Sequence, residues 1–119
     1  MARTNIPITE VVRAGAEQSA QTNSDMTNGM VFTPNDGTIF LEVENTDSVD
    51  HTFDVVASPT YTADGLVVSN LVLTVPAGEV WDFGPFKVAT FRQNINGDVY
   101  INPSVNTQLK FRATQRTPA

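Results

Sequence analysis

Alternating apolar and polar residues form the main pattern along this chain. The clearest case is the segment 38–44 (TIFLEVE), where every second residue is aliphatic and the others, apart from Thr38 and Phe40, are glutamates. A period of two is typical of a β-strand that buries one face. We therefore predict a strand with an aliphatic inner face and an acidic outer face, interrupted only by Phe40.

Eight further segments share this pattern or a β-branched composition: 5–13, 29–33, 51–57, 70–75, 79–83, 86–91, 99–101 and 108–113. Turn residues such as Asp36-Gly37 and Pro76-Ala77-Gly78 separate them. Eight or nine short strands at this spacing predict an all-β fold, a single antiparallel β-sandwich of the jelly-roll or immunoglobulin-like kind. We expect 38–44 and 51–57 to pair as a hairpin.

Helical signals are weak throughout the chain. Only 14–21 (AGAEQSAQ) has a locally helical composition, and its polarity predicts a loop or a single turn. Because no long amphipathic segment separates the strands, a βαβ sheet is excluded.

The 119 residues predict one domain with three parts. Residues 1–21 form an N-terminal arm, or an edge strand and loop, because Pro7 lacks the N–H that a central strand needs. Residues 22–113 form the sandwich. Residues 114–119 form a flexible C-terminal tail.

Charge is unevenly distributed along the sequence, and the net charge is −6. The segment between Arg13 and Lys87 holds 11 of the 13 acidic residues and no basic residue, whereas 87–119 holds five basic residues and one acid. Either the two signs lie on different faces, or both mix on the folded surface. The negative total argues against a general nucleic-acid binder.

Composition excludes several kinds of chemistry. The chain has no Cys, which removes disulfides, thiol catalysis and cysteine-based metal sites, and its one histidine, His51, cannot form a two-histidine site. No stretch is long and apolar enough to span a membrane. The first residues lack the apolar region of a signal peptide, so we expect synthesis in a cytoplasm.

Three groups of residues deserve a chemical test. His51 lies between Asp50 and Asp54, with Ser48 and Ser58 nearby in sequence, but no nucleophile elbow accompanies them, so we interpret His51 as a surface residue. Glu42 and Glu44 share one strand face, which solvent exposure explains as well as glycoside hydrolysis does. Asn45, Asp47 and Asp50 could bind Ca²⁺, but they do not match an EF-hand loop, and such residues are common in turns. We therefore predict no catalytic, cofactor-binding or metal-ligating residues.

Aromatic residues gather in the segment 81–91, which holds Trp81, Phe83, Phe86 and Phe91. Packing in the core explains them by default. A protein-binding patch is the alternative, and Phe40 on an otherwise acidic strand face is its best single indicator.

The order of several short motifs between residues 26 and 113 resembles that of a known family. The motifs are MTNGMV at 26–31, VENT at 43–46, LVLTVPAG at 71–78, FGPF at 83–86, FRQ at 91–93, NGDVYI at 96–101 and LKFR at 109–112. In this order they are similar to the small β-rich head proteins of tailed bacteriophages, which decorate or cement the outside of the capsid. Their order and spacing, rather than any single motif, make the resemblance.

The resemblance implies a virion structural protein, not an enzyme, that binds the outer surface of the assembled capsid and stabilises it. Its partner would be the major capsid protein, and it would form a homo-oligomer, as a trimer or in clusters, without cofactor, nucleic acid or membrane. Alternatives are a tail or head–tail joining subunit, and a carbohydrate-binding sandwich that attaches to host glycans through exposed Trp81 and Tyr61.

Two sets of residues are our candidates for contact with the partner. The first is an arm for strand addition and includes Arg3, Ile6, Ile8 and Arg13. The second includes Phe40 and the basic residues Lys110, Arg112 and Arg116, which would meet an acidic shell surface. In this orientation the basic strand faces the shell and the acidic loops face solvent.

Overall fold

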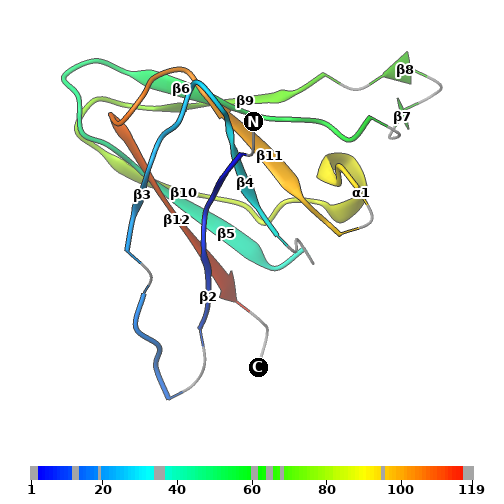
Figure 1. The fold of residues 1–119 in the computed structure, drawn as a ribbon, viewed down its shortest axis with the longest axis horizontal. Helices are drawn as coiled ribbons and strands as arrows, with labels where there is room; N and C mark the ends of the chain where they lie inside the picture. Colours follow the sequence, from blue (N-terminus) through cyan, green and yellow to red (C-terminus); the bar gives the residue numbers. More distant parts are fainter. Residues whose placement is uncertain are drawn as a thin grey trace.

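Two β-sheets pack face to face in the computed structural model (Figure 1). It describes residues 3–11, 14–18, 20–33, 37–59, 62–63, 66–67, 69–94 and 96–116. In strand order, sheet A consists of β1 (Thr4–Asn5), β4 (Met30–Phe32), β11 (Val99–Pro103), β6 (His51–Val55) and β9 (Leu71–Val75). Sheet B consists of β10 (Val80–Phe83), β5 (Ile39–Asn45), β12 (Leu109–Arg116) and β2 (Ile8–Val11), and β3 (Thr22–Asn23) also pairs with β12. The predicted all-β sandwich is confirmed.

Two smaller elements accompany the sheets. Strands β7 (Thr62–Ala63) and β8 (Leu66–Val67) pair with each other between β6 and β9 and project beyond the sandwich (Figure 1). One helical turn, α1 (Val88–Phe91), replaces the strand expected at 86–91. That expectation is wrong because the chain turns so that two of its aromatic rings pack against each other. Phe86 is buried and contacts Phe91 edge to face, with ring centroids 5.8 Å apart.

The chain passes from one sheet to the other at most of its connections. Strands β4, β5 and β6 lie in sheets A, B and A, and β9, β10, β11 and β12 alternate in the same way. The expected hairpin of 38–44 with 51–57 is therefore wrong, since β5 and β6 lie in opposite sheets. Alternation shows which face a strand buries, but it does not show which strand lies beside it.

Both sheets are mixed, which corrects the purely antiparallel expectation. Strand β1 runs parallel to β4, and β2 runs parallel to β12. The other pairs are antiparallel, as predicted. Parallel pairs need long connections, and the N-terminal segment has them because its partners lie far along the chain.

The core lies between the sheets, and the predicted aliphatic inner face of 38–44 is part of it. Its buried members are Ile6, Met30, Phe32, Ile39, Leu41, Val43, Phe53, Val55, Val75, Phe86, Val99, Ile101, Leu109, Phe111 and Ala113. Phe53 joins the two sheets, with its ring edge to face against Phe83 at 5.2 Å and Phe111 at 5.4 Å between centroids. Such contacts add to the burial of apolar area.

The sandwich extends beyond the expected range of 22–113 at both ends. Strands β1 and β2 bring residues 4–11 into the sheets, and β12 continues through Arg116, so 114–116 are strand residues and not a tail. Residues 117–119 lie outside the described residues. Between β2 and β3 the chain extends away from the sheets (Figure 1), and residues 14–18 and 20 are exposed and not helical.

Candidate functional site

The two lateral edges of the sandwich are built differently. One edge carries β1 and β2, and the residues between them cross from sheet A to sheet B. Ile6, in this crossing, is only 1% exposed and fills the space between the sheets. We call this side, made by residues 3–11, the closed edge.

Arg3 fastens the closed edge to the outer face of sheet A. Its Nη1 donates hydrogen bonds to Asn102 Oδ1 at 2.7 Å and to the carbonyl oxygens of Met30 and Ile101. The guanidinium carbon lies 4.1 Å from the centre of the Tyr100 ring, a cation–π arrangement. Arg3 is thus engaged within its own chain.

The hydroxyl of Thr4 donates a 2.7 Å hydrogen bond to Asp25 Oδ2 and ties the closed edge to the turn before β4. This bond and the backbone N–H of Asn28 lower the pKa of Asp25. The expected arm of Arg3, Ile6 and Ile8 does add strands, but it adds them to the sheets of its own chain. Arg13 lies outside the described residues.

The opposite side carries β9 and β10, the last strands of sheets A and B, and we call it the open edge. No further strand of the described residues pairs with either one. Leu71, on the inner face of β9, is 39% exposed, and Trp81, on the inner face of β10, is 45% exposed. Leu73 and Phe83 beside them are partly buried. The open edge thus leaves the inner faces of both strands partly exposed.

Backbone groups that have no partner among the described residues line the open edge. Asn45 N donates to Glu79 O at 2.9 Å, and bonded pairs alternate along an antiparallel ladder. The N–H and C=O groups of Val80 and Asp82 therefore point away from β5. In sheet A, Thr52 and Val56 bond to β11, so the same alternation points the backbone groups of Val72 and Thr74 outward from β9.

Trp81 is the largest exposed apolar side chain at this edge. Its Nε1 donates a 2.7 Å hydrogen bond to Glu79 Oε1, and its ring stacks on Phe83 with centroids 6.2 Å apart. Of the four aromatic residues predicted as core or patch, Phe86 is core, Phe83 and Phe91 pack against the core, and Trp81 remains at the surface. Successive apolar residues at 71–72 and 80–81, which interrupt the alternation, were the available sequence signal for this edge.

The charged side chains in and beside β9 and β10 are acidic. Glu79 and Asp82 are exposed beside Val80, and Asp54 lies directly across from Val72 on the outer face of sheet A. The open edge thus combines apolar side chains, unpaired backbone groups and negative charge.

The outer face of sheet B carries both signs of charge. Lys110 and Arg112 lie across from Glu44 and Glu42, and Arg112 Nη1 forms a 2.9 Å ion pair with Glu42 Oε1. On this face the two signs mix, which agrees with the second of the two alternatives that the sequence left open. Phe40 lies across from Thr114 on the same face and is partly buried. The side chain of Arg116 lies outside the described residues.

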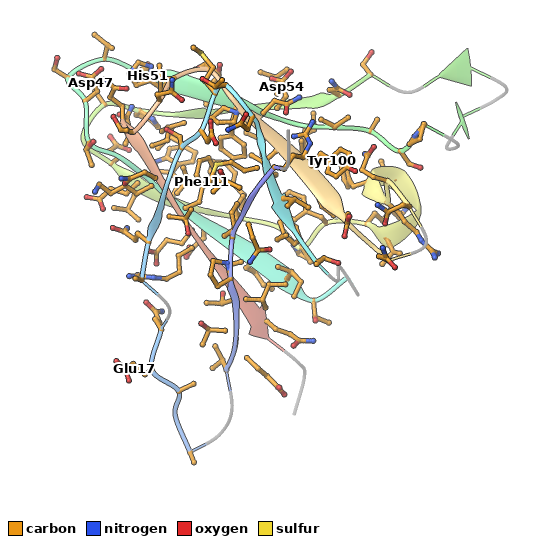
Figure 2. The ribbon with its side chains drawn as sticks, viewed as in Figure 1. Glu17, Asp47, His51, Asp54, Tyr100 and Phe111 are labelled. Atoms are coloured by element: carbon orange, nitrogen blue, oxygen red, sulfur yellow. The ribbon has the colours of Figure 1, made fainter. Side chains whose placement is uncertain are left out.

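The other chemical candidates carry structural hydrogen bonds. His51 Nε2 is 2.7 Å from Asp47 Oδ2 (Figure 2), so its partner is neither Asp50 nor Asp54. This contact and the backbone N–H of Ser48 lower the pKa of Asp47. Asp50 Oδ1 accepts the N–H of Ala77 at 2.9 Å.

The paired glutamates and Asn45 are likewise engaged. Glu42 pairs with Arg112, and Glu44 Oε1 accepts a 3.0 Å hydrogen bond from Gln21 Nε2. Asn45 Oδ1 accepts the N–H of Asp47 at 2.9 Å. Within the described ranges, no group of three His, Asp or Glu residues is placed to hold a metal ion.

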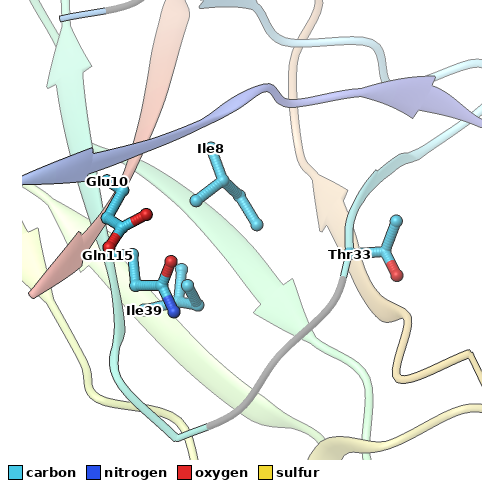
Figure 3. Close-up of a pocket in the computed structure, with 5 residues that line it drawn as sticks. All are labelled: Ile8, Glu10, Thr33, Ile39 and Gln115. Atoms are coloured by element: carbon cyan, nitrogen blue, oxygen red, sulfur yellow. The ribbon is translucent and has the colours of Figure 1, made fainter. Parts of the chain in front are cut away.

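A pocket of about 340 Å³ lies at the end of sheet B where β2 and the start of β5 flank the C-terminal end of β12 (Figure 3). Its apolar wall is Ile8 and Ile39, and its polar lining is Glu10, Gln115 and Thr33. Glu10 and Gln115 lie on one side and Thr33 on the other (Figure 3), and Thr33 Oγ1 already donates to Asn96 O at 3.1 Å. Because its polar groups do not converge, this pocket is a weaker candidate than the open edge.

Searches of the chain against protein-family models, curated proteins and solved structures found no match. In the part of the chain that the structure describes, no helix has the length and apolar character needed to cross a membrane.

Proposed function

We propose that this chain is a structural protein of a tailed-bacteriophage virion, which binds the outer surface of the assembled capsid and stabilises it without catalysing a reaction. The observation that carries the proposal is the open edge, where exposed apolar side chains and unpaired strand backbone lie together. Such a surface is suited to binding another protein. The partner is the major capsid protein, and the chain acts as a trimer or in clusters.

The family resemblance also supports this proposal, because two of its motifs lie at or next to the open edge. The motif at 71–78 supplies β9 and the turn that follows it, and the motif at 83–86 begins at the last residue of β10. One of the motifs that resemble capsid decoration proteins therefore forms part of the open edge, and another begins at its end.

Purified heads that lack the chain provide the test. We expect the added protein to co-sediment with heads, to appear in cryo-EM maps as density on the outer surface, and to raise the temperature at which the heads release DNA. Binding to isolated tails or to the head–tail joint instead, as a ring with a central channel, would overturn the capsid assignment in favour of a joining subunit.

Carbohydrate binding is a second candidate, favoured by the exposure of Trp81. Tyr61, the other expected stacking residue, lies outside the described residues. Sugar rings stack on exposed aromatic faces, and the hydrogen bond to Glu79 fixes the orientation of the indole. A glycan array tests this candidate: it predicts hits that disappear in Trp81→Ala, and an array without hits would exclude it.

A further inference from the structure

From the open edge we infer that β10 accepts an extended strand of a partner protein whose residues alternate between apolar and basic. This inference rests on the proposed subunit-binding function and names the contact that would serve it. The site is the outward side of Val80–Phe83.

The backbone geometry specifies how such a strand would pair. The N–H and C=O groups of Val80 and Asp82 point away from β5, so a partner strand can form the next ladder of sheet B. Strand addition of this kind gains affinity from main-chain hydrogen bonds and specificity from alternate side chains.

The inner face of the added strand meets an apolar surface. Partner residues across from Trp81 and Phe83 would point into the opening between the sheets and cover Trp81 and the exposed Leu71. Apolar side chains at these positions remove apolar area from water, which is favourable.

The outer face of the added strand meets negative charge. Partner residues across from Val80 and Asp82 would lie beside the exposed carboxylate of Asp82, so basic residues suit these positions. The same carboxylate disfavours pairing of β10 with β10 of a second copy, because that arrangement brings like charges together.

Charge also favours β10 over β9. Val72 and Thr74, whose backbone groups point away from β6, carry no charge, and Asp54, across from Val72, belongs to the neighbouring strand β6. A single partner strand cannot pair with β9 and β10 at once. Paired strands lie about 4.8 Å apart, whereas β9 and β10 belong to packed sheets, which lie about 10 Å apart.

The test uses the full chain and two end-blocked peptides, TVKVKVT and its charge-reversed control TVEVEVT. Titration followed by amide NMR should give saturable shifts at Val80 and Asp82 for the lysine peptide, with slowed hydrogen exchange at both amides. Binding of both peptides with equal affinity, or shifts confined to β9, would overturn the inference.

Two proline variants form a matched pair. Val80→Pro removes an N–H that points outward and keeps every hydrogen bond to β5. It should lower the affinity for the lysine peptide about tenfold, which corresponds to the loss of one main-chain hydrogen bond. Thr74→Pro makes the same change on β9 and should leave the affinity unchanged. Equal weakening by both variants would contradict pairing at β10.

Asp82→Lys keeps the test decisive if a proline variant fails to fold. It should reverse the preference so that the glutamate peptide binds more tightly, and an unchanged preference would overturn the charge argument. If the lysine peptide binds at β10 but the protein does not bind heads, the capsid function fails while the strand-accepting edge stands.

Discussion

Asn45 is a buried polar side chain that joins the two sheets. It ends β5 in sheet B, and its Nδ2 donates to Val75 O of sheet A at 3.0 Å and to Val49 O at 2.8 Å. Its Oδ1 accepts the N–H of Asp47. The bond to Val75 is buried and the other two are partly buried.

We therefore expect Asn45→Ala to lower the free energy of unfolding by about 1–3 kcal/mol, because it removes one buried and two partly buried hydrogen bonds. Urea denaturation measures this change. Asn23→Ala, at an exposed position, is the control and should change stability by less than about 0.5 kcal/mol. An equal effect of both substitutions would show that Asn45 does not join the sheets.

Asp25 and Asp47 make stability depend on pH. Hydrogen bonds from Thr4 and His51, respectively, are the main cause that lowers the pKa of each below its ordinary value of 3.8. A carboxyl group whose pKa is lower in the folded state stabilises the fold above the unfolded pKa, and this contribution disappears as the pH falls through the folded pKa.

We expect the free energy of unfolding to fall as the pH drops below about 4. The double variant Asp25→Asn, Asp47→Asn should show a smaller fall in urea denaturation between pH 2 and 7. Thr4→Val should raise the pKa of Asp25 in an NMR titration and leave that of Asp47 unchanged. An identical pH profile for the wild type and the double variant would refute this assignment.

At the scale of elements, residues 3–11 form the closed edge and cover one side of the sandwich. Ile6 is its buried centre, and Arg3 and Thr4 hold its start. The sequence predicts the strand and its edge position from Pro7, but not its two parallel partners, because nothing local to these residues specifies strands far along the chain.

Ile6→Ala should destabilise the protein by about 2–5 kcal/mol, since it removes a buried side chain and leaves a cavity between the sheets. Val11→Ala is the matched control on the same segment, because Val11 is exposed, and it should cost far less. Thermal unfolding of both variants measures the difference. A similar loss in both would mean that Ile6 does not close the edge.

The inner and outer faces of a strand could be predicted from its own sequence, because apolar and polar residues alternate along it with a period of two. This succeeds for β4, β5, β6 and β12. The successive apolar residues at 71–72 and 80–81 were not enough to locate the open edge, since the exposure of Leu71 and Trp81 depends on β9 and β10 being the last strands of different sheets. The turn α1 was missed because Phe86 and Phe91 fit a strand pattern equally well.

At the scale of the whole molecule, the path of the chain makes each sheet depend on the other for its formation. Strands that follow one another in sequence mostly lie in opposite sheets, so neither sheet is complete without both ends of the chain. Strand β12 pairs with β2, β3 and β5, which come from the first half of the sequence.

We therefore expect one cooperative unfolding transition and slow folding, on the order of milliseconds to seconds, because non-local pairs must form first. Far-UV and near-UV circular dichroism in urea should give coincident transitions, with stopped-flow mixing for the rate. Separate transitions would indicate that one sheet survives without the other. Removal of residues 109–119 is expected to abolish folding, and a folded truncated chain would contradict this picture.

Trp81 is the only tryptophan in the chain, and it lies on the open edge. Its emission therefore comes from this one place on the surface, without a background from the core. A partner that covers the indole should shift the emission to shorter wavelength and protect it from iodide quenching, whereas one that docks elsewhere should leave both unchanged. The protein thus carries an optical reporter of whether this edge is occupied, which can be read without labelling.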